Sequence, residues 1–186
     1  KSVEVIKFRK EMVRFTSGVS INNLSLNEND IGDFRTFLKL SPPLRTEEDR
    51  LALVEGLKDG LIEVIVSDHK PEDEESKRLT FAQAATGASG IETLLSLSLE
   101  LYHNGSLKLE TIIRALTSNP AKILKINKGN LSVGNDADLC IVDIDKPWIV
   151  KKEKLISKSK NTSIEDKKLQ GKVINTFVKG KELFKL

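Results

Sequence analysis

Apolar positions along the first two thirds of the chain follow two spacings. A run of β-branched residues predicts a buried strand at residues 62–67, and residues 13–19 are expected to form a short strand. Around them, apolar residues three and four positions apart predict amphipathic helices. These expected helices cover the opening residues, 47–59, 91–104, 109–116 and a short segment begun by Asn119. Strands that alternate with helices are typical of α/β folds.

The helix over 47–59 has the clearest boundaries. Thr46, with Asp49 three residues later, resembles a capping box after two prolines, and Gly60 is expected to end the helix. Ser106 is expected to cap the helix at 109–116. The side chains expected on the buried face of the 47–59 helix are Leu51, Leu53, Val54 and Leu57.

The pattern changes near Asn127. Short β-like runs then alternate with turns, and a Lys179-Gly180 turn predicts a hairpin. The lysine-rich stretch at 150–172 is expected to be a solvated loop. We therefore divide the chain into residues 1–126, built from strands and helices, and residues 127–186, a β annex. The β-like runs are 139–144, 148–150, 173–178 and 182–184.

Composition narrows the classes of function. With 39% hydrophobic and 31% charged residues the chain is globular in character, and a net charge of +3 with few aromatic residues does not favour nucleic acid. No window approaches the roughly 18 apolar residues of a membrane span. The single cysteine, Cys140, excludes an intramolecular disulfide and favours a reducing cytoplasm. Its strand-like surroundings predict a buried structural thiol. The chain opens inside a helical pattern without methionine, so we expect a fragment of a longer protein.

Asp68 and His69 stand where the buried strand at 62–67 should end. Enzymes built on parallel sheets carry their chemistry at the carboxyl ends of the strands. One interpretation of this pair is therefore catalysis. The alternative interpretation is a solvated loop that begins with two polar residues.

Six segments then occur in an order that is typical of one family. Together they resemble the carboxyl-terminal part of the dihydroorotases, a class similar to allantoinases and dihydropyrimidinases in the amidohydrolase superfamily. The resemblance covers almost all 186 residues, and "GIET" favours dihydroorotases over their relatives. The segments are "SPPLRTEEDRLALVEGL", "VIVSDHKPED", "GASGIETLLSLSLEL", "LTSNPAKIL", "GNLSVGNDADLCIVD" and "KGKELF".

This resemblance implies a (β/α)8 barrel, of which residues 1–126 form the last strand–helix units, with a small β-sandwich that includes residues 127–186. It implies the reversible conversion of N-carbamoyl-L-aspartate to L-dihydroorotate in pyrimidine biosynthesis. Zinc would activate a water and polarise the carbonyl. Most of its ligands are expected upstream of Lys1. The implied partners are a small-molecule substrate and, for the full-length protein, further copies of itself.

The resemblance assigns roles to single residues. Asp68 matches an aspartate that ligates metal and transfers a proton, whereas His69 is expected to make a structural hydrogen bond. Gly87 matches a glycine whose backbone approaches the substrate, and Thr86 replaces a bulkier residue beside it. Ser41 replaces a substrate-binding asparagine, so that contact is weakened or bridged by water.

One departure concerns charge. Glu72 replaces a histidine that binds the substrate carboxylate, so like charges would repel unless Glu72 points away or Lys70 supplies a replacement cation. Asn22 and Asn23 stand where paired histidines are frequent. These departures keep two alternatives open. One is a catalytically degenerate scaffold that supports aspartate carbamoyltransferase, and the other is an enzyme for a different cyclic amide.

Overall fold

Two separate sheets organise the computed structural model, which describes residues 1–186. β1 (Gly18–Ser20) and β2 (Val64–Val66) pair in parallel. β3 (Leu139–Ile149), β4 (Lys168–Val178) and β5 (Lys181–Lys185) form an antiparallel sheet in that order. The fold is therefore mixed α/β with a small antiparallel sheet, as the hydrophobic pattern predicts.

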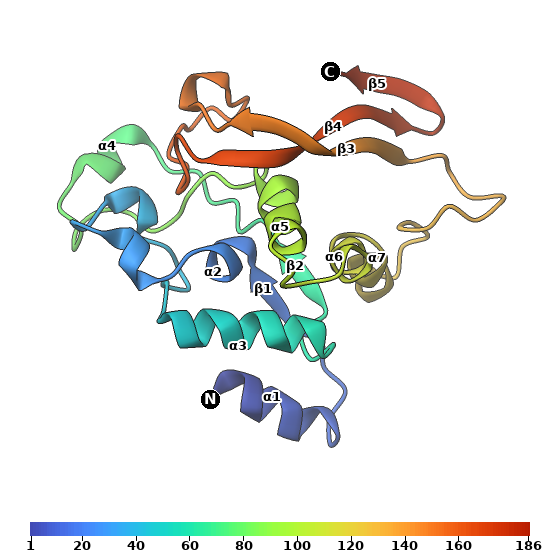
Figure 1. Ribbon diagram of the computed structural model, residues 1–186, viewed down its shortest axis with the longest axis horizontal. Coiled ribbons are helices and arrows are strands. Elements are labelled where there is room, and N and C mark those ends of the chain that lie inside the picture. Colours follow the sequence, from blue (N-terminus) through green and yellow to red (C-terminus); the bar gives the residue numbers. More distant parts are fainter.

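Helices separate and flank the two sheets (Figure 1). α5 lies between the parallel pair and the antiparallel sheet, while α3 and α1 lie on the opposite side of the parallel pair. No helix is long and apolar enough to cross a membrane. The α-helices are α1 (Ser2–Lys10), α2 (Ile21–Ser25), α3 (Glu47–Lys58), α4 (Glu74–Arg78), α5 (Leu94–His103), α6 (Leu109–Leu116) and α7 (Ser118–Leu124). The short 3-10 helices are η1 (Glu28–Ile31), η2 (Thr36–Leu38) and η3 (Lys152–Lys154).

The core gathers around the parallel pair and α5. Ile65 of β2, Leu97 and Leu101 of α5, and Ile112 of α6 are buried in one hydrophobic cluster. Within β2 only Ile65 is fully buried, whereas Val64 is half-buried and Val66, at the carboxyl end, is 43% exposed. The carboxyl ends of β1 and β2 lie at one edge of this core, since the two strands are parallel and in register.

The helix boundaries agree in part with those predicted from the sequence. Thr46 caps α3, and its side-chain oxygen accepts from the backbone N–H of Asp49 at 3.2 Å. Leu51, expected to be buried, is 52% exposed because the buried face of α3 is set by Val54 and Leu57. Ser106 does not cap α6, because the helix begins at Leu109 and the cap position falls on Lys108.

The annex, residues 127–186, departs further from what the sequence predicts. The two runs expected at 139–144 and 148–150 form one strand, β3, with an irregular register between Asp143 and Pro147. Lys179 and Gly180 form the predicted hairpin turn, and both have positive φ. Cys140 is exposed rather than buried, because no residue of β3 is fully buried. The division of the chain after residue 126 stays a prediction.

The lysine-rich stretch is only partly solvated. We define the strap as residues 159–164, which lie between β3 and β4. Its four residues 161–164 are all buried, and Thr162 is completely inaccessible. The expectation of a solvated loop is therefore wrong for the strap, because Asn161 and Ser163 are hydrogen-bonded inside the protein. It is also wrong for residues 168–172, which belong to β4.

Candidate active site

Asp68 lies two residues beyond Val66, the last residue of β2, and is half-buried. Its backbone adopts the left-handed conformation, with a φ of 49°. Few residues other than glycine adopt this conformation, although aspartate is among those that do. Backbone strain of this kind gathers at functional sites, so the conformation adds to the case for Asp68.

His69 makes the expected structural contact. Its Nδ1 accepts from the backbone N–H groups of Gly90 at 3.2 Å and Ile91 at 3.4 Å. Main-chain pairing joins the same two segments, because His69 bridges to Ala88 and the N–H of Lys70 donates to the Ala88 carbonyl at 2.9 Å. Since Nδ1 is an acceptor, the ring proton lies on Nε2. The segment after β2 is thus fixed beside residues 88–91.

Gly87 lies where two segments meet. Its N–H donates to the carbonyl of Lys39 at 2.9 Å. A Cβ at this position would lie 2.6 Å from the carbonyl oxygen of Lys70, and φ is 137°. Glycine is therefore required by packing. Ser41 is exposed and lies two residues after Lys39, so its connection to Gly87 runs through that bond.

Lys70 connects the other two predicted residues. Its Nζ donates to Oγ1 of Thr86 at 3.2 Å and lies 3.6 Å from Oε1 of Glu72. Glu72 is thus partly neutralised by a cation from its own loop. The structure brings Glu72, Thr86 and Gly87 together around Lys70, with Asp68 two residues earlier in the chain. Ser41 adjoins this group through the main chain.

A model of the amidohydrolase family matches residues 5–183. The chain belongs to the amidohydrolase family.

Its relatives narrow the resemblance. This amidohydrolase chain is 42% identical over 186 residues to a dihydroorotase of Ehrlichia chaffeensis and 40% identical over 185 residues to a dihydroorotase of Aquifex aeolicus. The alignments cover 100% and 99% of this chain but 42% and 44% of those proteins. The chain thus spans less than half the length of the curated relatives it matches. The predicted resemblance to dihydroorotases is confirmed.

A solved structure has the same fold. An L-hydantoinase (dihydropyrimidinase) from Arthrobacter aurescens superposes with a TM-score of 0.93 at 30% sequence identity. The match covers 98% of this chain and 42% of the hydantoinase chain.

Sequence reasoning missed three residues that hold the site of this amidohydrolase. Lys77 of α4 is 2% exposed, and its Nζ donates to the carbonyls of Ala85 at 2.7 Å and Thr36 at 3.1 Å. Burial lowers the pKa of Lys77 to about 8, against the opposing effect of the nearby Glu72 charge. Lys77 therefore joins the segment before Ser41 to the segment before Thr86.

Glu92 and Asn161 are the other two. The Glu92 carboxylate accepts from the N–H groups of Ile156 and Ser157, both at 2.9 Å. Asn161 belongs to the strap and contacts residues on both sides of the Lys70 group. "GIET" marked Glu92 as part of a family motif, but no local spacing connects either residue with partners more than 60 positions away.

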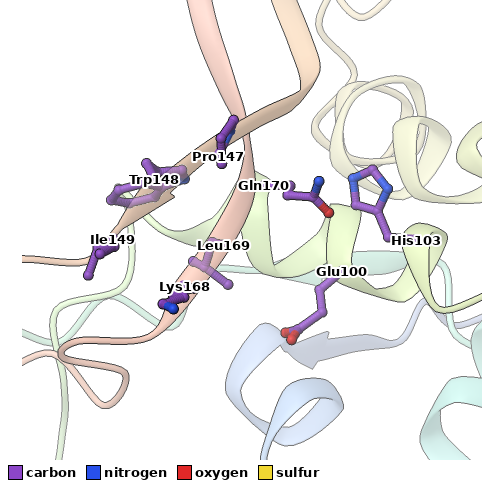
Figure 2. Close-up of a pocket in the computed structure, with 8 residues that line it drawn as sticks. All are labelled: Glu100, His103, Pro147, Trp148, Ile149, Lys168, Leu169 and Gln170. Atoms are coloured by element: carbon purple, nitrogen blue, oxygen red, sulfur yellow. The ribbon is translucent and has the colours of Figure 1, made fainter.

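Two hollows lie on the molecule, one beside the strap and one beside α5. A polar cleft of about 580 Å³ is lined by Glu72, Asp73, Lys158 and Asn161 among others, so Glu72 faces the strap side of the site. Another hollow, of about 540 Å³, lies where α5 meets β3 and β4 (Figure 2). Its lining includes none of the predicted site residues, and we assign it no role.

Metal ligation can be judged from the donors present. Asp68 offers one half-buried carboxylate at the end of a strand, which suits a single ligand to a divalent cation. The chain contains no group of three or more His, Cys, Asp or Glu side chains that could hold a metal ion. The residues of this chain thus fit a metal as contributors of one ligand.

Proposed function

We propose that the protein is a metal-dependent dihydroorotase that interconverts N-carbamoyl-L-aspartate and L-dihydroorotate in pyrimidine biosynthesis. The observation that carries the proposal is Asp68, at the carboxyl end of a buried parallel strand and in a strained backbone conformation. Identity of 40% or more to dihydroorotases along the whole chain supports the same substrate class. The site is expected to act in the cytoplasm.

The proposal includes the architecture. β1 and β2 would be neighbouring strands of a (β/α)8 barrel, and β3–β5 would be part of a β-sandwich. The parallel pairing and the surrounding helices support the barrel. Exposed apolar side chains on the antiparallel sheet, at Ile141, Leu183 and Phe184, are suited to packing against a further layer.

Asp68 has two tasks in this mechanism. Its carboxylate would hold zinc together with ligands from outside these residues, and a bound zinc ion supplies an activated water and a polarised carbonyl. In the hydrolytic direction Asp68 accepts the proton of the attacking water and returns it to the ring nitrogen as the amide bond breaks. A carboxylate suits both steps because it is an oxygen ligand and a base.

Substrate binding falls to the residues around Lys70. The main chain of Gly87 and the side chains of Ser41 and Thr86 would contact the ring. Lys70 would supply the cation for the substrate carboxylate, since its Nζ lies against Thr86 and only 3.6 Å from Glu72. On binding, the substrate carboxylate would replace Glu72 as the partner of Lys70.

Glu72 also favours a second candidate, an enzyme for a cyclic amide that lacks a carboxylate. The Glu72 carboxylate already lies beside the cation that dihydroorotate would need. In such an enzyme this ion pair would persist, and an uncharged ring would bind beside it.

Turnover of different rings separates these candidates. The full-length protein, loaded with zinc, is assayed with dihydroorotate, dihydrouracil and hydantoin. Preference for dihydroorotate supports the proposal, and preference for an uncharged ring supports the second candidate. If no ring is hydrolysed, the catalytic proposal fails, and co-purification with aspartate carbamoyltransferase tests the scaffold alternative.

The role of Lys70 has its own variant. Lys70→Met should raise the KM for dihydroorotate about 10-fold or more, because a charge-assisted contact is worth about 1.5–3 kcal/mol. Lys58→Met, at an exposed lysine of α3, is the matched control and should leave this KM unchanged. An unchanged KM in Lys70→Met would show that the substrate carboxylate binds elsewhere.

A further inference from the structure

The strap buries polar side chains beside the candidate active site. Asn161 is 3% exposed and Ser163 is 6% exposed. Buried polar groups in proteins are nearly always hydrogen-bonded, because an unpaired one costs about 1–3 kcal/mol. The partners of these groups therefore identify what the strap holds in place.

Asn161 bonds to the main chain at three places. Its Nδ2 donates to the carbonyl of Gly87 at 3.1 Å, and its Oδ1 accepts from the N–H of Glu72 at 3.3 Å. Its own carbonyl accepts from the N–H of Ser89 at 3.1 Å. Both ends of one amide thus connect the two segments that flank Lys70, whatever side chains those segments carry.

Neighbouring residues of the strap extend this contact. The hydroxyl of Ser159 donates to the carbonyl of Glu72, and the carbonyl of Ser159 accepts from the hydroxyl of Ser89 at 3.0 Å. The hydroxyl of Ser163 donates to Oδ1 of Asn22 at 2.9 Å. Asn22 follows the carboxyl end of β1, so the strap spans the edge at which both parallel strands end.

We propose that Asn161 is a positioning residue for the active site: it fixes the backbones of Glu72 and Gly87, and through them the substrate-binding group around Lys70. This inference rests on the proposed function for its kinetic test. Gly87 is packed against Lys70 so closely that a Cβ would not fit, and a shift at its carbonyl therefore moves the Lys70 group as well. Oδ1 of Asn161 also accepts from the hydroxyls of Ser89 and Ser159, so Asn161 contacts only protein atoms in this role, and it transfers no proton.

The sharpest variant is Asn161→Asp in the full-length zinc-loaded protein. It keeps the size and the acceptor for the Glu72 N–H, but it loses the donor to the Gly87 carbonyl and sets a carboxylate oxygen against it. We expect kcat/KM for dihydroorotate to fall about 10²-fold per folded molecule, because a misplacement of about 1 Å can cost that much. Most of the fall should appear in KM, since the affected groups bind substrate.

The matched control is Asn29→Asp, which adds the same charge on the exposed surface of η1. It should keep wild-type kinetics. If Asn161→Asp does not fold, Ser159→Ala removes the half-buried hydroxyl that contacts the Glu72 carbonyl and Oδ1 of Asn161. That variant should lower kcat/KM about 10-fold, in keeping with one hydrogen bond.

Hydrogen exchange gives a readout that does not depend on activity. Asn161→Asp should speed amide exchange at residues 70–73 and 86–90, and Asn29→Asp should not. Wild-type exchange in these segments overturns the inference, and so does faster exchange with wild-type kcat/KM, which would make the strap merely structural. If the wild-type protein hydrolyses no dihydroorotate, the proposed function fails and the exchange pattern alone decides whether Asn161 positions the site.

Discussion

The parallel pair and the antiparallel sheet differ in strand length and in how far their side chains are buried. β1 and β2 are three residues long, yet Ile65 of β2 lies in the hydrophobic cluster with Leu97 of α5 and is only 4% exposed. β3 and β4 have 11 residues each, yet Ile141 in β3 is 49% exposed. Strand length therefore does not indicate burial. The shorter, covered strands carry the candidate active site at their ends, and the longer, exposed ones carry the strap that reaches back to it.

This comparison predicts the greatest sensitivity at the end of β2. Asp68→Asn removes the proposed base and weakens a metal ligand, so kcat for dihydroorotate hydrolysis should fall about 10²–10⁴-fold. The measurement uses full-length protein with its zinc content determined in parallel. Asp59→Asn, at the exposed carboxyl end of α3, is the control for the same chemical change. Turnover of Asp68→Asn equal to that of the control would remove Asp68 from the mechanism.

The difference in burial predicts a difference in stability. Ile65→Ala should lower the free energy of unfolding by about 2–5 kcal/mol, as expected for a buried isoleucine. Ile141→Ala should cost about 1 kcal/mol, because half of that side chain is already in water. Urea unfolding of the two variants of the 186-residue chain tests this. Equal costs would mean that the two sheets are buried alike.

The lowered pKa of Lys77 predicts that the free energy of unfolding depends on pH. Burial lowers its pKa from 10.5 to about 8, so between these values the unfolded chain holds a proton that the native protein has released. The free energy of unfolding should therefore rise with pH from about 8 to about 10.5, by at most about 3 kcal/mol. Below pH 8 this contribution is constant.

Lys77→Met isolates this effect, because methionine keeps most of the unbranched side chain and does not titrate. The difference in unfolding free energy between wild type and variant should change across the stated window. Parallel pH profiles for the two proteins would contradict the lowered pKa. Lys58→Met serves again as the exposed control and should follow the wild-type profile.

The smallest effect is expected on the exposed sheet. Cys140→Ser should change the free energy of unfolding by about 0.5 kcal/mol or less, since the residue is on the surface. In native wild-type protein a thiol reagent should label Cys140, which the variant identifies by the loss of one labelled site. Labelling that requires denaturant would show that this face of β3 is covered in the full-length protein.

The sequence by itself determined the elements and the location of the candidate chemistry. Thr46 predicted the start of α3, Lys179 and Gly180 predicted the hairpin, and the apolar run before Asp68 predicted β2. These features can be predicted from the sequence because caps, turns and periodic burial depend on residues a few positions apart. The order of the motifs also indicated the family that the comparisons show.

Only the tertiary structure decided which side chains hold the site together. Asn161 meets Gly87 across 74 positions, and Lys77 meets Thr36 across 41. The exposure of Cys140 and the burial of the strap also depend on what packs against each segment. Local spacing carries no information on such partners, because a buried polar residue and a solvated one have the same sequence pattern until the chain has folded around one of them.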